Sequence, residues 1–436
     1  MSKSLYKRRE VLSWAMYDWA NSAYNTTVIS AFFPVFFGSY WNSGVEETVS
    51  TARLGFSNSF AFIVIALLAP VLGSIADRSM SKKRFLGFFC ALGVIMTFGL
   101  FFINQGEWQM AAFCYILATI GFSGSIVFYD SLLTSVAANE SEYNKISTYG
   151  YSVGYLGGGL LLAVNVAMTL QPAWFGLADA AQAVKYSFVM VAVWWGLFTL
   201  PLMLNVKEPP EENPQTGLQA VKAGLNQLRQ TFAEIRGQRN IFLFLLAYWL
   251  YIDGIDTIIT MAVKYGQSIG FETTDLITAL LMVQFVGFPA AFAFGFLAQK
   301  IGSRKAIYLA IFIYLCLSMF GAFISEVWHF YVLAFVIGLV QGGIQAISRA
   351  YFAGLIPKEK SGEYFGFYNM IGKFAAVIGP TLMGFAGLTF LKMGYPDDTA
   401  SRMSITVISI LFLLGAYFFS KVKDPQASAQ TQEEGH

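Results

Sequence analysis

The sequence predicts an all-α membrane protein with twelve transmembrane helices arranged as two six-helix bundles. Hydrophobic residues make up 56% of the 436 residues, and charged residues make up only 12%. A soluble domain carries about 25% charged residues, so this chain has too few to cover a water-exposed surface. The remaining observation is a regular series of apolar segments, each long enough to cross the hydrocarbon core of a bilayer.

Twelve such segments follow one another along the chain, separated by polar loops. Their expected positions are residues 13–39, 56–76, 85–103, 108–130, 147–170, 185–204, 241–262, 276–298, 306–325, 329–352, 364–390 and 402–420. The first run is longer than a signal-peptide core and lacks a small-residue cleavage site, so we count it as a transmembrane helix. An even number of crossings leaves both termini on one side of the membrane.

The basic residues indicate which side that is. Of the 28 Lys and Arg residues, 21 lie in the termini and in the loops on the same side as the termini, against 5 in the opposite loops. Cytoplasmic loops carry the excess of positive charge in membrane proteins. We therefore expect a multi-pass membrane protein with both termini in the cytoplasm.

The longest segment between spans, residues 205–240, separates an N-terminal bundle at 1–204 from a C-terminal bundle and short tail at 241–436. Apolar residues in this segment recur at spacings of three and four: Leu218, Val221, Leu225, Leu228, Phe232 and Ile235. The pattern predicts an amphipathic helix along the inner membrane surface or beneath the bundle. A plain linker and a regulatory element both fit this pattern.

The two halves of the chain repeat each other. Residues 73–84 and 295–305 both begin with Gly, two residues and Ala, and both continue to a basic cluster. The pattern Asp-x-x-Asn-Ser at 18–22 returns as Asp-x-x-Asp-Thr at 253–257. Six plus six helices in repeated halves is the layout of many secondary transporters.

Span one carries a polar stripe within an apolar run. Asp18, Asn21 and Asn25 are spaced by three and four residues and share one helix face. A carboxylate at membrane depth costs about 3 kcal/mol even on lenient insertion scales, so it faces a protein interior or a water-filled path. The stripe therefore lines a cavity, or Asp18 lies close enough to the interface to stay hydrated.

Few other ionisable groups lie inside the predicted spans. They are Asp253, Asp256 and Lys373 at depth, with Asp130 and Arg349 nearer the inner face. With Asp18 included, carboxylates outnumber cations, and a desolvated carboxylate takes up and releases protons near neutral pH. Asp18, Asp253 and Asp256 are thus the proton-coupling candidates. In the alternative, Lys373 pairs with Asp253 or Asp256 as a static tie.

A small zwitterionic solute needs a cation for its carboxylate and an anion for its ammonium group. Lys373 or Arg349 suits the first role, and Asp18 or Asp253 suits the second. The neutral candidates for a binding wall are Asn21, Asn25, Gln284, Gln341, Gln345, Tyr24 and Tyr251. A single Tyr in a chain with 22 of them is more often a packing residue. Arg349 also fits a cytoplasmic gate with Asp130.

The loop at 73–84 resembles the signature between the second and third helices of the major facilitator superfamily. Gly73, Ala76, Asp77 and Arg78 match it, while Met80 replaces a Gly of the family pattern. In the second copy, Gln299 stands in place of the Asp. The resemblance implies that Asp77 and Arg78 belong to a structural and gating latch rather than to a substrate site.

A subgroup resemblance is carried by YDWANSAY at 17–24, GLVQGGIQAISRAYFAGLIP at 338–357 and EYFGFYNMIGKFAAVIGP at 363–380. These stretches are similar to the vacuole-effluxer-like family, related to the autophagy-linked amino-acid exporter of the yeast vacuole. Membership implies efflux of small solutes, with amino acids as the leading candidates. Gly150 and Gly154 also follow an antiporter pattern of the superfamily, although Tyr155 replaces its proline. Close helix packing alone explains such glycines.

Other classes of protein fit less well. The chain contains His329 and His436 as its sole histidines, and it has no phosphate-cradling loop, so we expect neither an enzyme nor an ATP-driven pump. A channel is a further alternative, as is an importer of a sugar, nucleoside or metal chelate. We expect no cofactor, no metal and no nucleic acid. The expected partners are a small-molecule substrate, a proton or sodium ion and the lipid bilayer, and we expect a monomer.

Overall fold

The computed structural model describes residues 5–79, 81–208, 217–268, 270–375 and 378–423, which are helical apart from short connections. The chain forms two compact units. Unit 1 comprises Met1–Ala138, Tyr149–Leu225 and Glu359–Met370, and unit 2 comprises Asn139–Thr148, Asn226–Lys358 and Ile371–His436. Each unit therefore includes a short segment from the other half of the sequence.

Among the described residues, ten helices are long and apolar enough to cross a membrane. The predicted first and eleventh spans are not among these ten. The first is divided by π-helical turns. The eleventh is described on both sides of residues 376–377, which lie outside the described residues, as α14 (Ser361–Ala375) and α15 (Ile378–Lys392). The hydropathy pattern predicts where apolar segments lie, but it does not predict the division of the first span.

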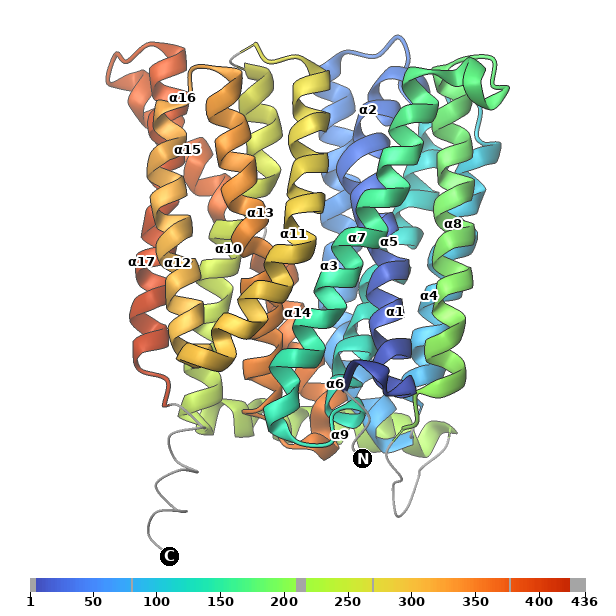
Figure 1. Cartoon of the computed structure of the whole chain (residues 1–436), viewed down its shortest axis with the longest axis vertical. Helices are drawn as coiled ribbons and strands as arrows, with labels where there is room; N and C mark the ends of the chain where they lie inside the picture. Colours follow the sequence, from blue (N-terminus) through green and yellow to red (C-terminus); the bar gives the residue numbers. More distant parts are fainter. Residues whose placement is uncertain (1–4, 80, 209–216, 269, 376–377, 424–436) are drawn as a thin grey trace, which may run out of the picture. The chain divides into compact units, whose positions relative to one another are not determined.

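Unit 1 is a bundle of helices. They are α1 (Arg9–Ala23), α3 (Glu47–Ser79), α4 (Lys82–Gly99), α5 (Trp108–Ser131), the short α6 (Leu133–Val136), α7 (Tyr143–Leu170) from Tyr149 onward, and α8 (Ala180–Asn205). In Figure 1, α4 lies beside α5 and α8, and α1 packs against α8. Glycines permit the closest approach, because a Cβ at Gly121 would lie 2.5 Å from the amide nitrogen of Gly93.

Span one contains two π-helical segments, Tyr24–Phe32 and Phe37–Trp41, separated by the short helix α2 (Phe33–Phe36). The hydroxyl of Ser30 donates to the carbonyl of Asn25 at 2.9 Å, five residues back. Long π-helical stretches are rare, and π turns inside α-helices often lie at functional sites. The division of span one therefore begins within the polar stripe of the sequence, between Asn21 and Asn25.

Unit 2 contains the corresponding helices of the second half. They are α10 (Arg239–Ser268), α11 (Thr273–Ile301), α12 (Ser303–Phe320), α13 (Val327–Ala353), α15, α16 (Asp397–Thr406) and α17 (Ser409–Ser420). The main packing pairs are α11 with α13 and α10 with α17. The predicted helix of the 205–240 segment is α9 (Gly217–Gly237), whose residues are divided between the two units.

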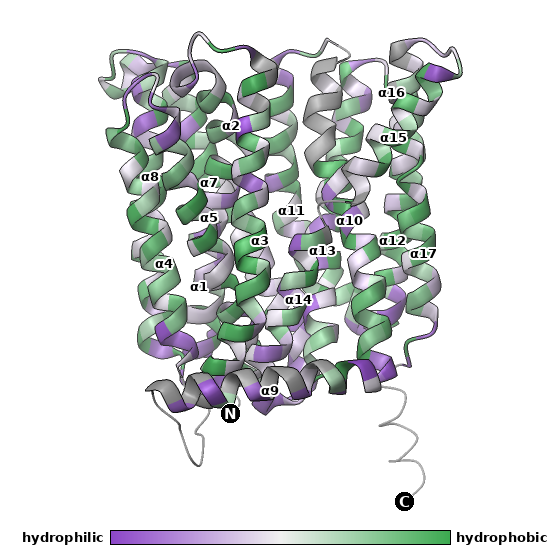
Figure 2. Ribbon diagram, turned by 180° about the vertical axis from the view of Figure 1, so that it is seen from behind, coloured by the Kyte–Doolittle hydropathy of each residue, from purple (hydrophilic) through white to green (hydrophobic). Residues whose placement is uncertain are grey.

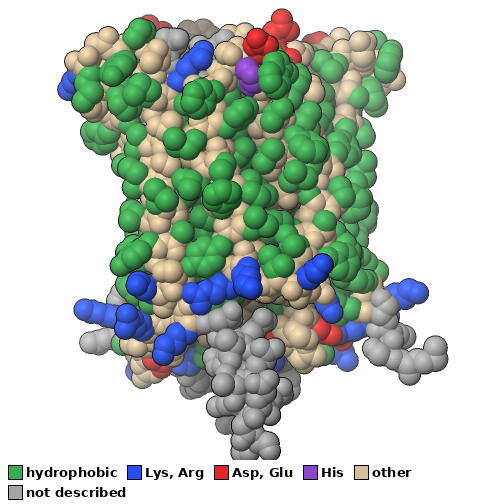
Figure 3. All heavy atoms as spheres, turned by 60° about the vertical axis from the view of Figure 1, so that its left-hand side comes forward, with side chains coloured by type: hydrophobic (Ala, Val, Ile, Leu, Met, Phe, Trp, Pro, Cys, Tyr) green, Lys and Arg blue, Asp and Glu red, His purple; other side chains and the backbone are tan. Residues whose placement is uncertain are grey.

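Exposed apolar side chains cover the outward faces of these helices. Phe56, Leu204 and Phe312 are 72%, 81% and 61% exposed. Figure 2 shows long hydrophobic stretches along α3, α8, α12 and α17. On the face in Figure 3, hydrophobic side chains cover the middle, and Lys and Arg side chains gather toward one end. Such a surface is suited to lipid, since a backbone that crosses hydrocarbon must satisfy its own polar groups, as helices do.

Candidate functional site

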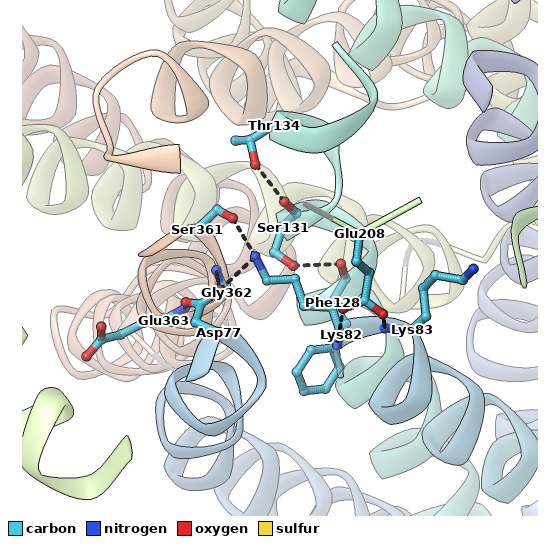
Figure 4. A network of polar contacts seen from close by, with 10 residues as sticks. All are labelled: Asp77, Lys82, Lys83, Phe128, Ser131, Thr134, Glu208, Ser361, Gly362 and Glu363. Atoms are coloured by element: carbon cyan, nitrogen blue, oxygen red, sulfur yellow. Dashed lines mark hydrogen bonds and ion pairs between the residues drawn. The ribbon is translucent and has the colours of Figure 1, made fainter. Parts of the chain in front are cut away.

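The sequence-predicted gating residue Asp77 lies at the centre of a polar cluster in unit 1 (Figure 4). One carboxylate oxygen accepts the backbone N–H of Gly362 at 3.0 Å, and the other accepts that of Glu363 at 2.8 Å. Lys82 forms an ion pair with Asp77 at 2.7 Å and donates to the hydroxyl of Ser361 at 2.9 Å. We call these residues, Asp77, Lys82 and Ser361 to Glu363, the latch.

The latch joins the end of α3 to the start of α14. The first N–H groups of a helix have no intrahelical acceptor, and the helix dipole favours a negative charge there, so Asp77 stabilises the first turn of α14. Glycines bring the two backbones together, because a Cβ at Gly73 would overlap the carbonyl oxygen of Gly362. A Cβ at Gly366 would lie 2.7 Å from the carbonyl oxygen of Ala69.

Glu208, directly after α8, anchors the segment between the halves to the latch. Its two carboxylate oxygens each accept one backbone N–H at the start of α4, from Lys82 and from Lys83, both at 3.0 Å (Figure 4). The ammonium group of Lys83 donates to the carbonyl of Val206 at 2.7 Å. Burial raises the pKa of Glu208, while these N–H groups and the two lysines act to lower it. Sequence reasoning missed this contact, and its signal is an acid between Lys207 and Pro209 after span six.

The other predicted gating residues lie in different surroundings. Asp130 is buried at the end of α5 and accepts from the side-chain amide of Asn369 at 3.1 Å in unit 1. Arg349, only 2% exposed in α13, donates to the hydroxyl of Ser147 at 2.8 Å and to its carbonyl at 3.0 Å in unit 2. Their predicted pairing stays a prediction. The side chain of Arg78 lies outside the described residues.

The second copy of the loop pattern makes a neutral contact in unit 2. The side-chain amide of Asn144, at the start of α7, donates to the hydroxyl of Ser303 at the start of α12, at 2.7 Å. A Cβ at Gly295 would overlap the side chain of Thr148. Gln299, which replaces the aspartate of the first copy, donates to the carbonyl of Gly295 in its own helix. The two copies thus hold corresponding helix starts, α14 and α7, with different chemistry.

Asp18 in α1 is buried against α5 and α7. Its carboxylate accepts the hydroxyl of Tyr129 at 2.7 Å. The indole of Trp14 stacks on the Tyr129 ring at a centroid distance of 4.3 Å and donates to the Tyr129 carbonyl at 3.1 Å. A Cβ at Gly150 would lie 2.5 Å from the carboxylate, and one at Gly154 would lie 2.7 Å from the hydroxyl of Ser22. The glycine pattern of span five therefore serves the packing of α7 on α1.

The remaining predicted binding residues of span one differ in accessibility. Asn21 is buried, and Asn25 is exposed in the π-helical segment. Tyr24 is fully buried, shares a hydrogen bond of 3.0 Å with the hydroxyl of Thr119 and packs on Trp195. Its position between helices is that of a packing residue, so we leave Tyr24 out of the proposed binding set.

Unit 2 contains the other neutral candidates. Tyr251 is fully buried and shares a hydrogen bond of 2.7 Å with the hydroxyl of Ser348, so we leave it out on the same grounds. Gln284 is 8% exposed in α11, whereas Gln341 and Gln345 are half-buried in α13. Within the described part of the chain, the side-chain oxygen of Gln341 is buried and has no hydrogen-bond partner.

The acidic pair of span seven faces the two helices of span eleven. Both carboxylate oxygens of Asp253, which is 0% exposed, accept the backbone N–H of Gly379, at 3.0 and 3.1 Å. One turn further along α10, Asp256 interacts electrostatically with Lys373 in the last turn of α14. Lys373 therefore interacts electrostatically with Asp256, whereas Asp253 accepts hydrogen bonds from a backbone amide.

Comparison with solved structures defines the class of protein. The fold matches the proton:xylose symporter XylE bound to 6-bromo-6-deoxy-D-glucose with a TM-score of 0.72, over 96% of this chain and 98% of that one at 14% identity. The human organic anion transporter MFSD10 matches with a TM-score of 0.69, over 94% and 99% at 14% identity. The chain thus has the twelve-helix, two-bundle fold of the major facilitator superfamily.

The chain belongs to the family described as vacuole effluxer Atg22 like, whose model matches residues 44–431. It is 37% identical to the uncharacterized MFS-type transporter YxiO of Bacillus subtilis, over 97% of this chain and 96% of that protein. Autophagy-related protein 22 of Yarrowia lipolytica is 24% identical over 80% of this chain and 72% of its own length. The predicted family is confirmed, and the chain is a transporter of that family.

Proposed function

We propose that this transporter exports amino acids across the membrane in exchange for protons. The supporting observation is the pair of buried carboxylates, Asp18 and Asp253, at corresponding positions of the two sequence repeats. Each accepts hydrogen bonds from a neutral donor, the hydroxyl of Tyr129 or the amide of Gly379. A carboxylate in a desolvated setting of this kind is suited to bind and release a proton during transport.

The proposed solute site combines charged and neutral groups from both halves. Asp18 or Asp253 receives the ammonium group of the solute, and Lys373 or Arg349 receives its carboxylate, because a zwitterion needs both partners in a low-dielectric site. The neutral hydrogen-bonding candidates are Asn21, Asn25, Gln284, Gln341 and Gln345. A proton on Asp18, Asp253 or Asp256 changes the charge of this site and thereby releases or admits the solute.

Transport then proceeds by alternating access, in which the bundles at 1–204 and 241–436 rock around the site. The latch stabilises one state through Asp77 and the first turn of α14, and it opens in the other state. Asp130 and Arg349 form a second gating pair. In this proposal both termini are cytoplasmic in a bacterial inner membrane, and the protein works as a monomer.

Two experiments test the cargo and its carriage. A thermal-shift screen of the purified protein with amino acids, dipeptides, sugars and nucleosides reports binding, because a ligand of the folded form raises its melting temperature. Counterflow of a radiolabelled amino acid into proteoliposomes then tests carriage. We expect amino acids to raise the melting temperature and to exchange. Stabilisation by sugars or nucleosides alone, with no amino-acid counterflow, would contradict the proposal.

A further inference from the structure

The carboxylate of Asp253 in α10 accepts a backbone N–H of another helix. Gly379, which donates it, lies in α15, the helix described from Ile378 onward. Both oxygens of the Asp253 carboxylate lie within hydrogen-bond distance of that single N–H, at 3.0 and 3.1 Å. At Gly379, α15 is thus held to α10 by an acceptor whose strength depends on its charge.

The contact is made by backbone on one side and by the carboxylate on the other. A Cβ at Gly379 would overlap the hydroxyl of Thr257 and would lie 3.1 Å from a carboxylate oxygen of Asp253. Glycine is therefore required for α15 to come this close to α10. Because Gly379 has no side chain, Asp253 contacts this residue through hydrogen bonds to its backbone N–H.

The charged groups around Asp253 do not take the place of the Gly379 N–H as its hydrogen-bond donor. Asp256, on the same helix, acts on Asp253 as a like charge, and Lys373 of α14 acts on Asp256. The guanidinium of Arg349 on α13 is directed to Ser147. The sequence of α17 has no charged residue. On the other neighbours of α10, the charged residues are near helix ends: Asp275, Lys300, Arg304, Lys305 and Lys392. Within the described residues, Asp253 forms no ion pair with Lys or Arg.

We propose that Asp253 converts proton uptake into a loosening of α15 at Gly379, an inference that rests on the proposed proton-coupled function. A proton from the aqueous phase adds to one carboxylate oxygen, which becomes a hydroxyl. The N–H of Gly379 then retains one neutral acceptor in place of a charged one, and such a hydrogen bond is roughly half as strong. Return of the proton to water restores the charged acceptor.

Gly379 lies in the predicted span 364–390, which directly follows the last latch residue, Glu363. α15 follows α14 in the sequence, and α14 begins with the latch residues Ser361 to Glu363. A change at Gly379 therefore occurs in the predicted span that adjoins the latch. Asp253 acts as a positioning residue for this span, in addition to its role as a proton-binding group.

Hydrogen–deuterium exchange of the Gly379 amide tests the proposal directly. The purified full-length protein is labelled without solute from about pH 5 to about pH 8, with labelling times scaled to the intrinsic exchange rate at each pH. Fragmentation of the peptide that covers Gly379 resolves its amide. In the parent we expect protection of this amide to rise by about tenfold with increasing pH, as Asp253 becomes charged. In Asp253→Asn we expect low protection with no dependence on pH.

Asp275→Asn is the matched control, because Asp275 is a carboxylate of unit 2 in the first turn of α11 that accepts from Tyr331 at 2.9 Å. In this variant, the protection of the Gly379 amide and its dependence on pH should match those of the parent. Protection in the parent that does not change with pH, or that is unchanged in Asp253→Asn, overturns the proposal. If Asp253→Asn does not fold, the parent pH series alone decides. Because no solute is used, failure of amino-acid counterflow refutes the cargo while leaving this result intact.

Discussion

The ion pair between Asp77 and Lys82 allows the latch to be tested quantitatively. The two side chains are 8% and 4% exposed and 2.7 Å apart. Asp77→Asn keeps the size of the side chain but leaves the buried ammonium group of Lys82 without its carboxylate. It also replaces two charge-assisted N–H bonds, from Gly362 and Glu363, with weaker ones. Removal of one partner from a buried ion pair costs about 3 to 5 kcal/mol, so we expect a destabilisation of that size.

A double-mutant cycle separates the pair from other effects. The thermal unfolding of the purified protein is compared for the parent, Asp77→Asn, Lys82→Met and the double variant. We expect the double variant to be more stable than the sum of the single losses implies, with a coupling energy of about 2 kcal/mol or more. Arg84→Met, at an exposed position of the same helix, should change stability by less than about 0.5 kcal/mol. Additive losses from Asp77 and Lys82 would refute the latch as described.

Three further predictions concern the neighbourhood of the latch and the buried acid of unit 1. Gly73→Ala should destabilise the protein by about 1 to 3 kcal/mol through backbone overlap, whereas Gly55→Ala, which meets open space, should not, as melting temperatures will show. Burial raises the pKa of Glu208, so the protonated carboxyl stabilises the folded protein at low pH, and this stabilisation is lost as the pH rises above 4.5. The free energy of unfolding of the parent, relative to that of Glu208→Gln, should therefore fall over that range. Tyr129→Phe removes the donor to Asp18 and should shift the pH profile of transport, while an unchanged profile would show that this hydrogen bond does not tune Asp18.

Much of the fold was predictable because lipid imposes a simple rule on composition. Apolar length identified the spans, ten of which are long continuous helices among the described residues, and the loop pattern at 73–84 identified Asp77 as a latch residue. The π-helical division of span one was not predictable, since hydropathy is insensitive to a change from i−4 to i−5 hydrogen bonding. The grouping of Asn139–Thr148 with unit 2 and of Glu359–Met370 with unit 1 depends on tertiary contacts that no local pattern records.

The candidate site was likewise predictable only in part. The spacing of Asp18 and Asp253 identified buried acids, because carboxylates are conspicuous in an apolar segment. Their donors, the hydroxyl of Tyr129 and the amide of Gly379, are distant in sequence and carry no signal of their own. The cap that Glu208 places on α4 was missed for the same reason. Tyr24 and Tyr251 fit a binding wall by composition, but their hydrogen bonds place them in helix packing.

Solute accumulation driven by a pH gradient is the most direct measurement of the central claim, which is that buried carboxylates of the two repeats couple solute movement to protons. Proteoliposomes with parent, Asp18→Asn, Asp253→Asn or Asp275→Asn are given an imposed pH gradient and a radiolabelled amino acid. We predict accumulation against the solute gradient by the parent and by Asp275→Asn, and none by the Asp18 and Asp253 variants. Accumulation by both of those variants at the parent level would contradict the account.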